Sequence, residues 1–235
     1  MGFAPDGVPF RNDSGQTIPA YGVMRVTGVA VVEGMPVLTV DQPDNKFHRW
    51  FLLNGPIDVP AGGSSNQYGT AQDGSYPAFA LYDPATLPGG QDNPNLGDHW
   101  GVDNGSWKLV FGREGFYVLG GAYGSPAADD GSGGETPSTQ RTIVRPYAIR
   151  QVVAKLTATL TANGNAQATL QQSSTTGSVL TYSDTSITAV MVFDGGFLPP
   201  GQALTDGTLV FCEQMLDSDR LLVIQADTCP TAAGG

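Results

Sequence analysis

Signals for helices are almost absent from the chain, and the clearest alternation of apolar and polar residues has the period of a β-strand. Windows with apolar residues at helical spacing and without intervening Gly or Pro are scarce. The segment RPYAIRQVVAKLTATLTANG comes closest to a helix, but Leu156, Ala158, Leu160 and Ala162 alternate with threonines within it. A period of two and enrichment in Thr favour a strand there. The chain is therefore predicted to be all-β.

The predicted strands fall into two regions, with one boundary near residue 120. In the first region, the strands are predicted at 18–27, 29–33, 36–40, 49–53, 78–82, 107–111 and 116–119. In the second region, they are predicted at 143–147, 151–161, 166–172, 178–182, 187–193, 208–213 and 220–225. Spacings of about 8–12 residues between strands are typical of β-sandwiches and small β-barrels.

Short segments with turn-forming residues separate several of these strands. EGM at 33–35 and GREG at 112–115 are predicted to be hairpin turns, because Gly adopts the positive φ that a tight turn needs. TANGNA at 161–166 contains Asn-Gly, which is the strongest short-range hairpin signal in the chain. QMLDSDR at 214–220 is predicted to be a further hairpin.

Two other kinds of connection stand out. IPAYG and ALTDG are predicted to be turns that lead into strands, where Pro19 fixes φ and Gly22 and Gly207 permit a bend. The loops at 60–77 and 84–106 are long for a compact domain, and loops of that length are usually functional or covered by a partner.

The domain organisation follows from the stretch GAYGSPAADDGSGGETPSTQR at 121–141, which has no branched apolar residue. We predict that it is a Gly/Ser/Pro-rich linker between two small β-barrel or β-sandwich domains. The N-terminal β domain is then 1–120, with long loops and an extended N-terminal arm that begins MGFAPDGVPF. The C-terminal β domain is 142–235.

Composition and charge narrow the classes of partner. Charged residues make up 14% of the chain, well below the roughly 25% of an average globular protein, so Ser, Thr, Asn, Gln and Gly must cover the surface. The formal net charge is −11, which disfavours direct binding to nucleic acid or to an anionic membrane surface. We also expect no signal peptide and no membrane span, since no basic stretch precedes an apolar run and no apolar run reaches about 18 residues.

Candidate catalytic residues are few. His48 and His99 belong to no metal-binding motif, and the Asp98-His-Trp segment is as well explained by a surface His beside a buried Trp. The segment DGSGG at 130–134 lacks the GxSxG frame of a serine hydrolase and lies in the predicted linker. The sequence therefore predicts no catalytic residue, no cofactor-binding residue and no metal ligand, and the protein is predicted not to be an enzyme.

Acidic residues leave two alternatives open. The segments 41–45 and 92–98 hold several Asx residues that could gather oxygens for Ca²⁺, although Asx side chains in loops more often bond their own backbone. A pair of carboxylates for glycoside hydrolysis would come from neighbouring strands and is not excluded by spacing.

The tryptophans and cysteines are interpreted structurally. Trp50, Trp100 and Trp107 each adjoin a strand or turn with apolar neighbours and are expected in the core. Cys212 lies in an apolar strand and Cys229 near the C-terminal end of the sequence. A disulfide between them is one alternative, but the expectation is that they form no essential bridge, because structural disulfides are rare in a reducing cytoplasm.

Several segments together resemble structural proteins encoded in the virion gene clusters of tailed bacteriophages. The resemblance is carried by NDSGQTIPAYGVMRVTGV, FLLNGPIDVPAGG, YPAFALYD, LGDHWGVDNGSWKL, GREGFYVLGG and LPPGQALTDGTLVFCEQ…RLLVIQADTC. It covers about two thirds of the chain as a pattern of turns and strand beginnings, and it includes no catalytic residue. It implies a capsid-associated, decoration-like or fibre-like protein.

The functional expectation is a virion structural protein made in the host cytoplasm. We expect a capsid decoration, or cement, protein that binds the major capsid protein on the outside of the shell as a homotrimer. The alternative is a tail fibre, spike or head–tail adaptor that binds a host surface or a tail partner. A β-fold hydrolase is the third hypothesis, and turnover of a glycan panel would distinguish it.

Overall fold

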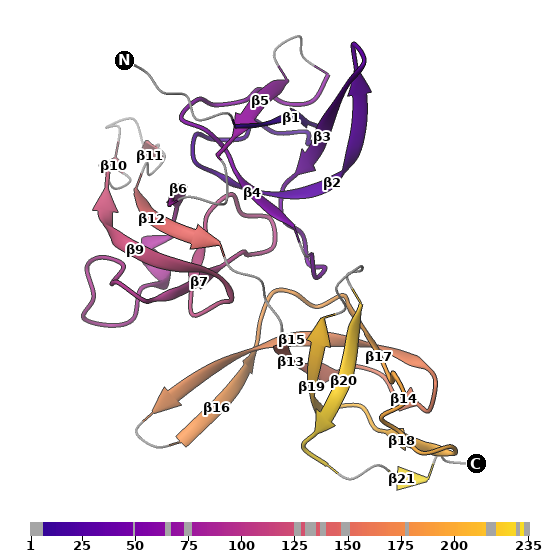
Figure 1. Ribbon diagram of the computed structural model, residues 1–235. Coiled ribbons are helices and arrows are strands. Elements are labelled where there is room, and N and C mark those ends of the chain that lie inside the picture. Colours follow the sequence, from indigo (N-terminus) through magenta and orange to yellow (C-terminus); the bar gives the residue numbers. More distant parts are fainter. Residues whose placement is uncertain are drawn as a thin grey trace. The chain divides into compact units, whose positions relative to one another are not determined.

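The structure is a computed structural model, and in the part of the chain that it describes the regular elements are β-strands (Figure 1) and one short 3₁₀ helix. It describes residues 7–48, 50–63, 67–72, 77–124, 128–129, 135–136, 140–146, 151–176, 179–214, 220–228 and 231–232. The 3₁₀ helix is η1 (Pro84–Thr86), which Asp83 caps by accepting a hydrogen bond from the Ala85 N–H. The all-β prediction is confirmed.

The chain divides into two compact units, and the division is not a single cut. The first unit is Met1–Pro43 with Trp50–Tyr147, and the second is Asp44–Arg49 with Ala148–Gly235. This differs from the predicted linker at 121–141, because strand β12 (Arg141–Pro146) pairs with strands of the first unit. Residues 125–127, 130–134 and 137–139 of that stretch lie outside the described residues.

One five-stranded sheet of the first unit has the order β4-β2-β3-β1-β5. Its strands are β1 (Val8–Asn12), β2 (Val23–Val32), β3 (Met35–Asp41), β4 (Phe51–Leu53) and β5 (Tyr68–Ala71). The edge strands meet through an Asn54–Ala71 bridge and a 2.8 Å hydrogen bond from Gln72 N to Leu53 O, so the sheet curls back on itself. Its core is built from Phe10, Ile18, Met24, Val40, Val59 and Ala71.

The segment that was expected to form an extended N-terminal arm lies partly inside this sheet. β1 pairs with both β3 and β5, and Phe10 is fully buried. A short strand with only one strongly buried apolar side chain gives little alternation, which is why the sequence pattern does not reveal it. Residues 1–6 lie outside the described residues.

A second five-stranded sheet of the first unit has the order β6-β12-β9-β7-β8. Its remaining strands are β6 (Ala78–Leu81), β7 (His99–Gly101), β8 (Val110–Phe111) and β9 (Gly115–Tyr123). A parallel Tyr82–Leu109 bridge brings its edges together. β10 (Ala128–Asp129) and β11 (Glu135–Thr136) form a separate two-stranded pair. The predicted hairpin at 112–115 is wrong, because β7 lies between β8 and β9 and pairs with both.

These two sheets repeat one topology. When the strands of each sheet are numbered in chain order, the first lies between the third and the fifth, and the second lies between the third and the fourth. In each sheet the first and third strands are parallel neighbours, and the fourth meets the fifth. The first unit therefore contains the same strand arrangement twice in succession.

The second unit contains a closed five-stranded barrel in the order β13-β19-β20-β17-β15, completed by pairing of β15 with β13. Its strands are β13 (Gln151–Leu156), β15 (Asn165–Thr176), β17 (Val190–Phe193), β19 (Leu209–Gln214) and β20 (Leu221–Ala226). β17 and β20 are the one parallel pair. Starting from the parallel pair, the strands follow one another around this barrel in the same order as in each sheet of the first unit. The strand that comes first in the chain, β13, holds a different place in that order.

The barrel core includes a residue from early in the chain. Phe47, in the segment 44–49, is buried with the barrel residues, and the Ala189 N–H donates to Asn45 O at 2.9 Å. The other buried core residues are Ala154, Leu156, Leu160, Ala166, Ala168, Ile187, Val190, Val192, Leu198, Leu204, Val210, Cys212, Leu221 and Val223.

Two further features complete the second unit (Figure 1). β16 (Val179–Asp184) pairs with β15 alone, and the two extend as a ribbon. β14 (Leu160–Thr161), β18 (Gln202–Leu204) and β21 (Thr231–Ala232) form a three-stranded sheet. The predicted strand at 151–161 is therefore interrupted after Leu156, and Ala158 is exposed rather than on the buried face.

Most of the predicted turns form. Glu33 and Gly34 both have positive φ, 50° and 81°, and connect β2 to β3 as a two-residue hairpin turn. Gly22 donates to Pro19 O at 3.0 Å immediately before β2, and Gly207 has a φ of 84° before β19. The Asn-Gly turn also forms, but β14 on its N-terminal side pairs with β18.

Candidate functional site

The two histidines are engaged in separate local pairs. His48 Nε2 lies 2.6 Å from Asp44 Oδ1, within the segment that belongs to the second unit. His99 Nδ1 lies 3.4 Å from Glu114 Oε2, and its ring packs edge-on against Tyr117 with 4.6 Å between centroids.

The side chains of the acidic segments bond to nearby groups of the protein. Asp41 pairs with Arg25 at 3.0 Å and accepts the Gln42 N–H at 2.7 Å, while Asp98 accepts the Asn95 N–H at 2.7 Å. Within the described residues, no group of three or more His, Cys, Asp or Glu side chains is placed to hold a metal ion. The segment 130–134 lies outside those residues.

The tryptophans differ from one another. Trp100 is fully buried and packs edge-on against Tyr82 and Phe111, with ring centroids 5.4 and 5.7 Å away. Trp107 is half-buried against the core of the first sheet. The expectation of a core position is wrong for Trp50, which immediately precedes β4 and is 61% exposed.

Cys212 is a buried residue of β19 and faces the barrel core. Burial disfavours the thiolate and raises the pKa of Cys212 to about 12. Cys229 lies outside the described residues, so the expectation of no essential bridge between the two stays a prediction.

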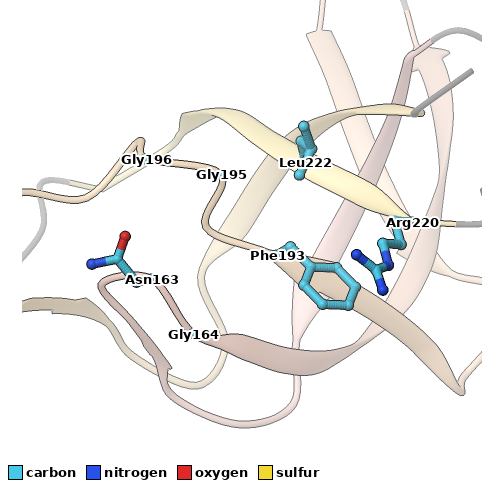
Figure 2. A pocket seen from close by; sticks show the side chains of 7 residues that line it. All are labelled: Asn163, Gly164, Phe193, Gly195, Gly196, Arg220 and Leu222. Atoms are coloured by element: carbon cyan, nitrogen blue, oxygen red, sulfur yellow. The ribbon is translucent and has the colours of Figure 1, made fainter.

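A pocket of about 350 Å³ lies on the second unit, at one end of the parallel strand pair (Figure 2). It is lined by Asn163, Gly164, Phe193, Gly195, Gly196, Arg220 and Leu222. Phe193 and Leu222 are half-buried, whereas Asn163, Arg220 and both glycines of the 195–196 pair are exposed. The pocket therefore has an apolar floor and a polar, solvent-facing rim.

Strand register positions the floor and the cation of the pocket. Phe193 of β17 and Leu222 of β20 are register partners in the parallel pair, so their side chains lie side by side. Arg220 immediately precedes β20 and lines the pocket together with Leu222. Its guanidinium carbon lies 5.1 Å from the centre of the Phe193 ring, a cation–π contact.

The rim is organised by Asp194, which is fully buried next to the pocket. Its carboxylate accepts backbone N–H groups from Leu198 at 2.6 Å, Asn163 at 2.8 Å and Gly196 at 3.3 Å. Its own N–H donates to Gly164 O at 3.1 Å. One side chain thus joins the 163–164 turn to the 195–198 loop, which are the two sides of the rim.

Backbone conformation also requires the residue types found at the rim. Gly195 and Gly196 have φ of 61° and 91°, where side chains other than Gly are strained. A Cβ at Gly195 would lie 3.1 Å from Leu222 Cδ2. Asn163 has a φ of 57°, and Asn is among the residues that adopt this conformation most readily.

The sequence pattern did not predict this pocket. The Asn-Gly pair and the FDGG segment at 193–196 were the available signals, and both were interpreted only as turn formers. What brings them together is the antiparallel pairing of β15 with β17, and the parallel pairing of β17 with β20 adds Leu222. The side chains that line the pocket include no carboxylate, imidazole, thiol or hydroxyl group.

Comparisons of the chain with protein-family models, with curated proteins and with solved structures found no match.

Nothing in the described part of the chain forms a helix of the length and hydrophobicity needed to cross a membrane.

Proposed function

We propose that the protein is a virion structural protein of a tailed bacteriophage that decorates the outside of the capsid and stabilises it. The observation that carries this proposal is the exposure of apolar side chains near the ends of two β-ribbons, one in each unit. The resemblance of the quoted segments to phage virion proteins supports the same conclusion, as does a pocket lining without catalytic groups.

The first ribbon is the hairpin of β2 and β3. Val29 and Val31 are 65% and 75% exposed and, two residues apart on one strand, point to the same face. Pro36 is the register partner of Val31 and is exposed as well. An apolar strip of this kind on a protein with few charged residues is typical of a protein–protein contact.

The second ribbon is formed by β15 and β16, whose pairing runs from Gln171–Asp184 to Thr176–Val179. Its described side chains are mostly polar, but Val179 and Leu180 on β16 are exposed. A two-stranded ribbon has little stability of its own in water, so such an extension gains stability by contact with a partner.

The proposed partner is the major capsid protein, and the proposed assembly is a homotrimer on the outer surface of the shell. The acidic charge of the chain suits a position away from packaged DNA. Several weak contacts made by one oligomer add avidity. A protein that binds only the assembled shell shifts the equilibrium towards assembly.

Particles that lack the protein provide the test. Rebinding of purified protein is expected to raise the temperature at which the particles release DNA. Val31→Lys and Leu180→Lys are expected to abolish rebinding, because each puts a charge into an apolar contact. Ile57→Lys is the matched control, since Ile57 is also 75% exposed but lies on neither ribbon. Equal DNA release with and without bound wild-type protein would overturn the proposal.

The alternative function is a tail fibre, spike or head–tail adaptor that binds a host surface or a tail partner, and the pocket of the second unit favours it. Electron microscopy of virions with labelled antibody separates the two functions. Label over the shell supports decoration, and label confined to the tail supports the alternative.

A further inference from the structure

We infer that the outer face of the β9–β12 pair in the first unit binds the acidic surface of a second copy of the chain. The inference rests on the proposed function, because it names the contact that holds the proposed homotrimer together. The side chains of this face, which we term the arginine–tyrosine face, are Tyr117, Leu119, Tyr123, Arg141, Ile143 and Arg145.

Strand register places an arginine opposite a tyrosine at each end of the face. β9 and β12 pair antiparallel (Figure 1), with Arg141 opposite Tyr123 and Arg145 opposite Tyr117. On β9, Tyr117, Leu119 and Tyr123 are 37%, 40% and 45% exposed. The face therefore combines accessible aromatic and aliphatic surface with arginine, and aromatic residues and arginine are enriched where proteins bind one another.

Aromatic rings hold the Arg141 end of the face in place. The guanidinium carbon of Arg141 lies 4.8 Å from the centre of the Tyr21 ring and 5.1 Å from that of Phe79. The Phe79 ring in turn packs edge-on against Tyr123, with 5.6 Å between centroids. Within the described residues, the buried Nε of Arg141 has no hydrogen-bond partner. Rings thus position this cation before a partner arrives, which lowers the entropy lost on binding.

The face is locally positive on an acidic chain. Arg145 is exposed, and in the described part of the chain neither Arg145 nor Arg141 forms an ion pair. By contrast, Arg11, Arg25 and Arg113 each pair with an aspartate at 2.6–3.0 Å. The chain has 22 acidic and 11 basic residues, so carboxylates are plentiful, yet these two arginines are left for a carboxylate from outside.

Charge complementarity favours a second copy as the partner. With a formal net charge of −11, the remaining surface of a neighbouring copy is rich in carboxylates, which guanidinium groups bind through paired N–H donors. A cyclic trimer forms when one surface of each subunit binds a different surface of the next, and a basic face on an acidic chain provides two such surfaces. Single-stranded nucleic acid also stacks on tyrosines, but the net charge repels its phosphates.

The experiment is sedimentation velocity of the purified full chain over a dilution series. Wild type is expected to sediment as a trimer that dissociates on dilution. Arg145→Glu is expected to raise the concentration at which the trimer dissociates by at least about tenfold, because it sets like charges against each other. Leu119→Thr is expected to weaken the trimer by removing apolar contact area, while Thr suits an exposed strand position. Lys46→Glu makes the same charge change on an exposed residue of the second unit and is expected to have no effect.

A monomeric wild type overturns the inference, and so does a trimer that both Arg145→Glu and Leu119→Thr leave unchanged. Equal weakening by Lys46→Glu also overturns it, since overall charge would then explain the effect. Saturable binding of an oligothymidine that is lost in Arg145→Glu would assign the face to nucleic acid instead. Decoration is measured separately, by DNA release from particles, so a monomer that still stabilises particles contradicts this inference and leaves the capsid-stabilising role intact.

Discussion

Replacing Asp194 by alanine is expected to destabilise the second unit selectively. The substitution removes a buried carboxylate that accepts three backbone N–H groups across the rim of the pocket. A hydrogen bond to a charged group contributes about 1.5–3 kcal/mol, and the upper part of that range applies to the buried Leu198 donor. The Asn163 and Gly196 donors are partly buried, so water replaces much of their loss.

The expected net loss is about 3 kcal/mol, since alanine also removes the cost of holding a carboxylate out of water. For a unit of this size, each kcal/mol lowers the unfolding midpoint by about 4–8 °C. The second unit of the Asp194→Ala variant is therefore expected to unfold at least about 12 °C below wild type.

The distribution of tryptophans provides the assay. Trp50, Trp100 and Trp107 all lie in the first unit, so tryptophan fluorescence follows that unit alone. Calorimetry of the whole chain follows both. The calorimetric transition of the second unit, which tryptophan fluorescence does not follow, is expected to move to lower temperature in the Asp194→Ala variant. Asp184→Ala, on the exposed ribbon, is the control and is expected to change little. A shift of less than about 4 °C for Asp194→Ala would refute the proposed role of the carboxylate.

Three further predictions concern separate positions. Glu33→Asn is expected to raise the stability of the first unit by about 0.5 kcal/mol in a fluorescence-monitored urea titration, because Asn-Gly suits a turn in which residue 33 and Gly34 have positive φ; a destabilised variant contradicts this. In a Cys229→Ser background, Cys212 is expected to resist a thiol reagent at pH 8 until the protein unfolds. Because burial raises the pKa of Cys212, the protonated thiol makes its full contribution to stability below the pKa that Cys212 has in the unfolded chain. That contribution is lost as the pH rises towards about 12. Phe47→Ala is expected to cost the second unit about 3–5 kcal/mol by calorimetry, and an effect on tryptophan fluorescence alone would show that the side chain belongs elsewhere.

Long alternating segments were predictable from the sequence, whereas short strands were not. The turn between β2 and β3 follows from Gly34, but β2 is one strand where the sequence predicted two, at 18–27 and 29–33. β5 and β7 lie inside segments that were predicted to be loops. They have four and three residues, too few for a period to show, and their pairing partners lie elsewhere in the chain.

The pocket was less predictable than the fold for a related reason. Its floor depends on the parallel pairing of Phe193 with Leu222, and its rim depends on backbone hydrogen bonds to Asp194. Neither leaves a periodic pattern. The positive φ of Asn163 was signalled by the Asn-Gly pair, but a turn signal alone does not show which loop the turn will face.

The segment 44–49 makes the second unit a product of two distant stretches of chain, because the polypeptide passes between the units three times. A fragment that starts at Ala148 would lack Phe47 and the Asn45 carbonyl that accepts the Ala189 N–H. Conversely, a protease site engineered at the 147–148 junction would cut the backbone without releasing the C-terminal piece, which would stay bound through the docked segment. The protein is therefore suited to fragment complementation, in which residues 44–49 of the N-terminal fragment bind the C-terminal fragment.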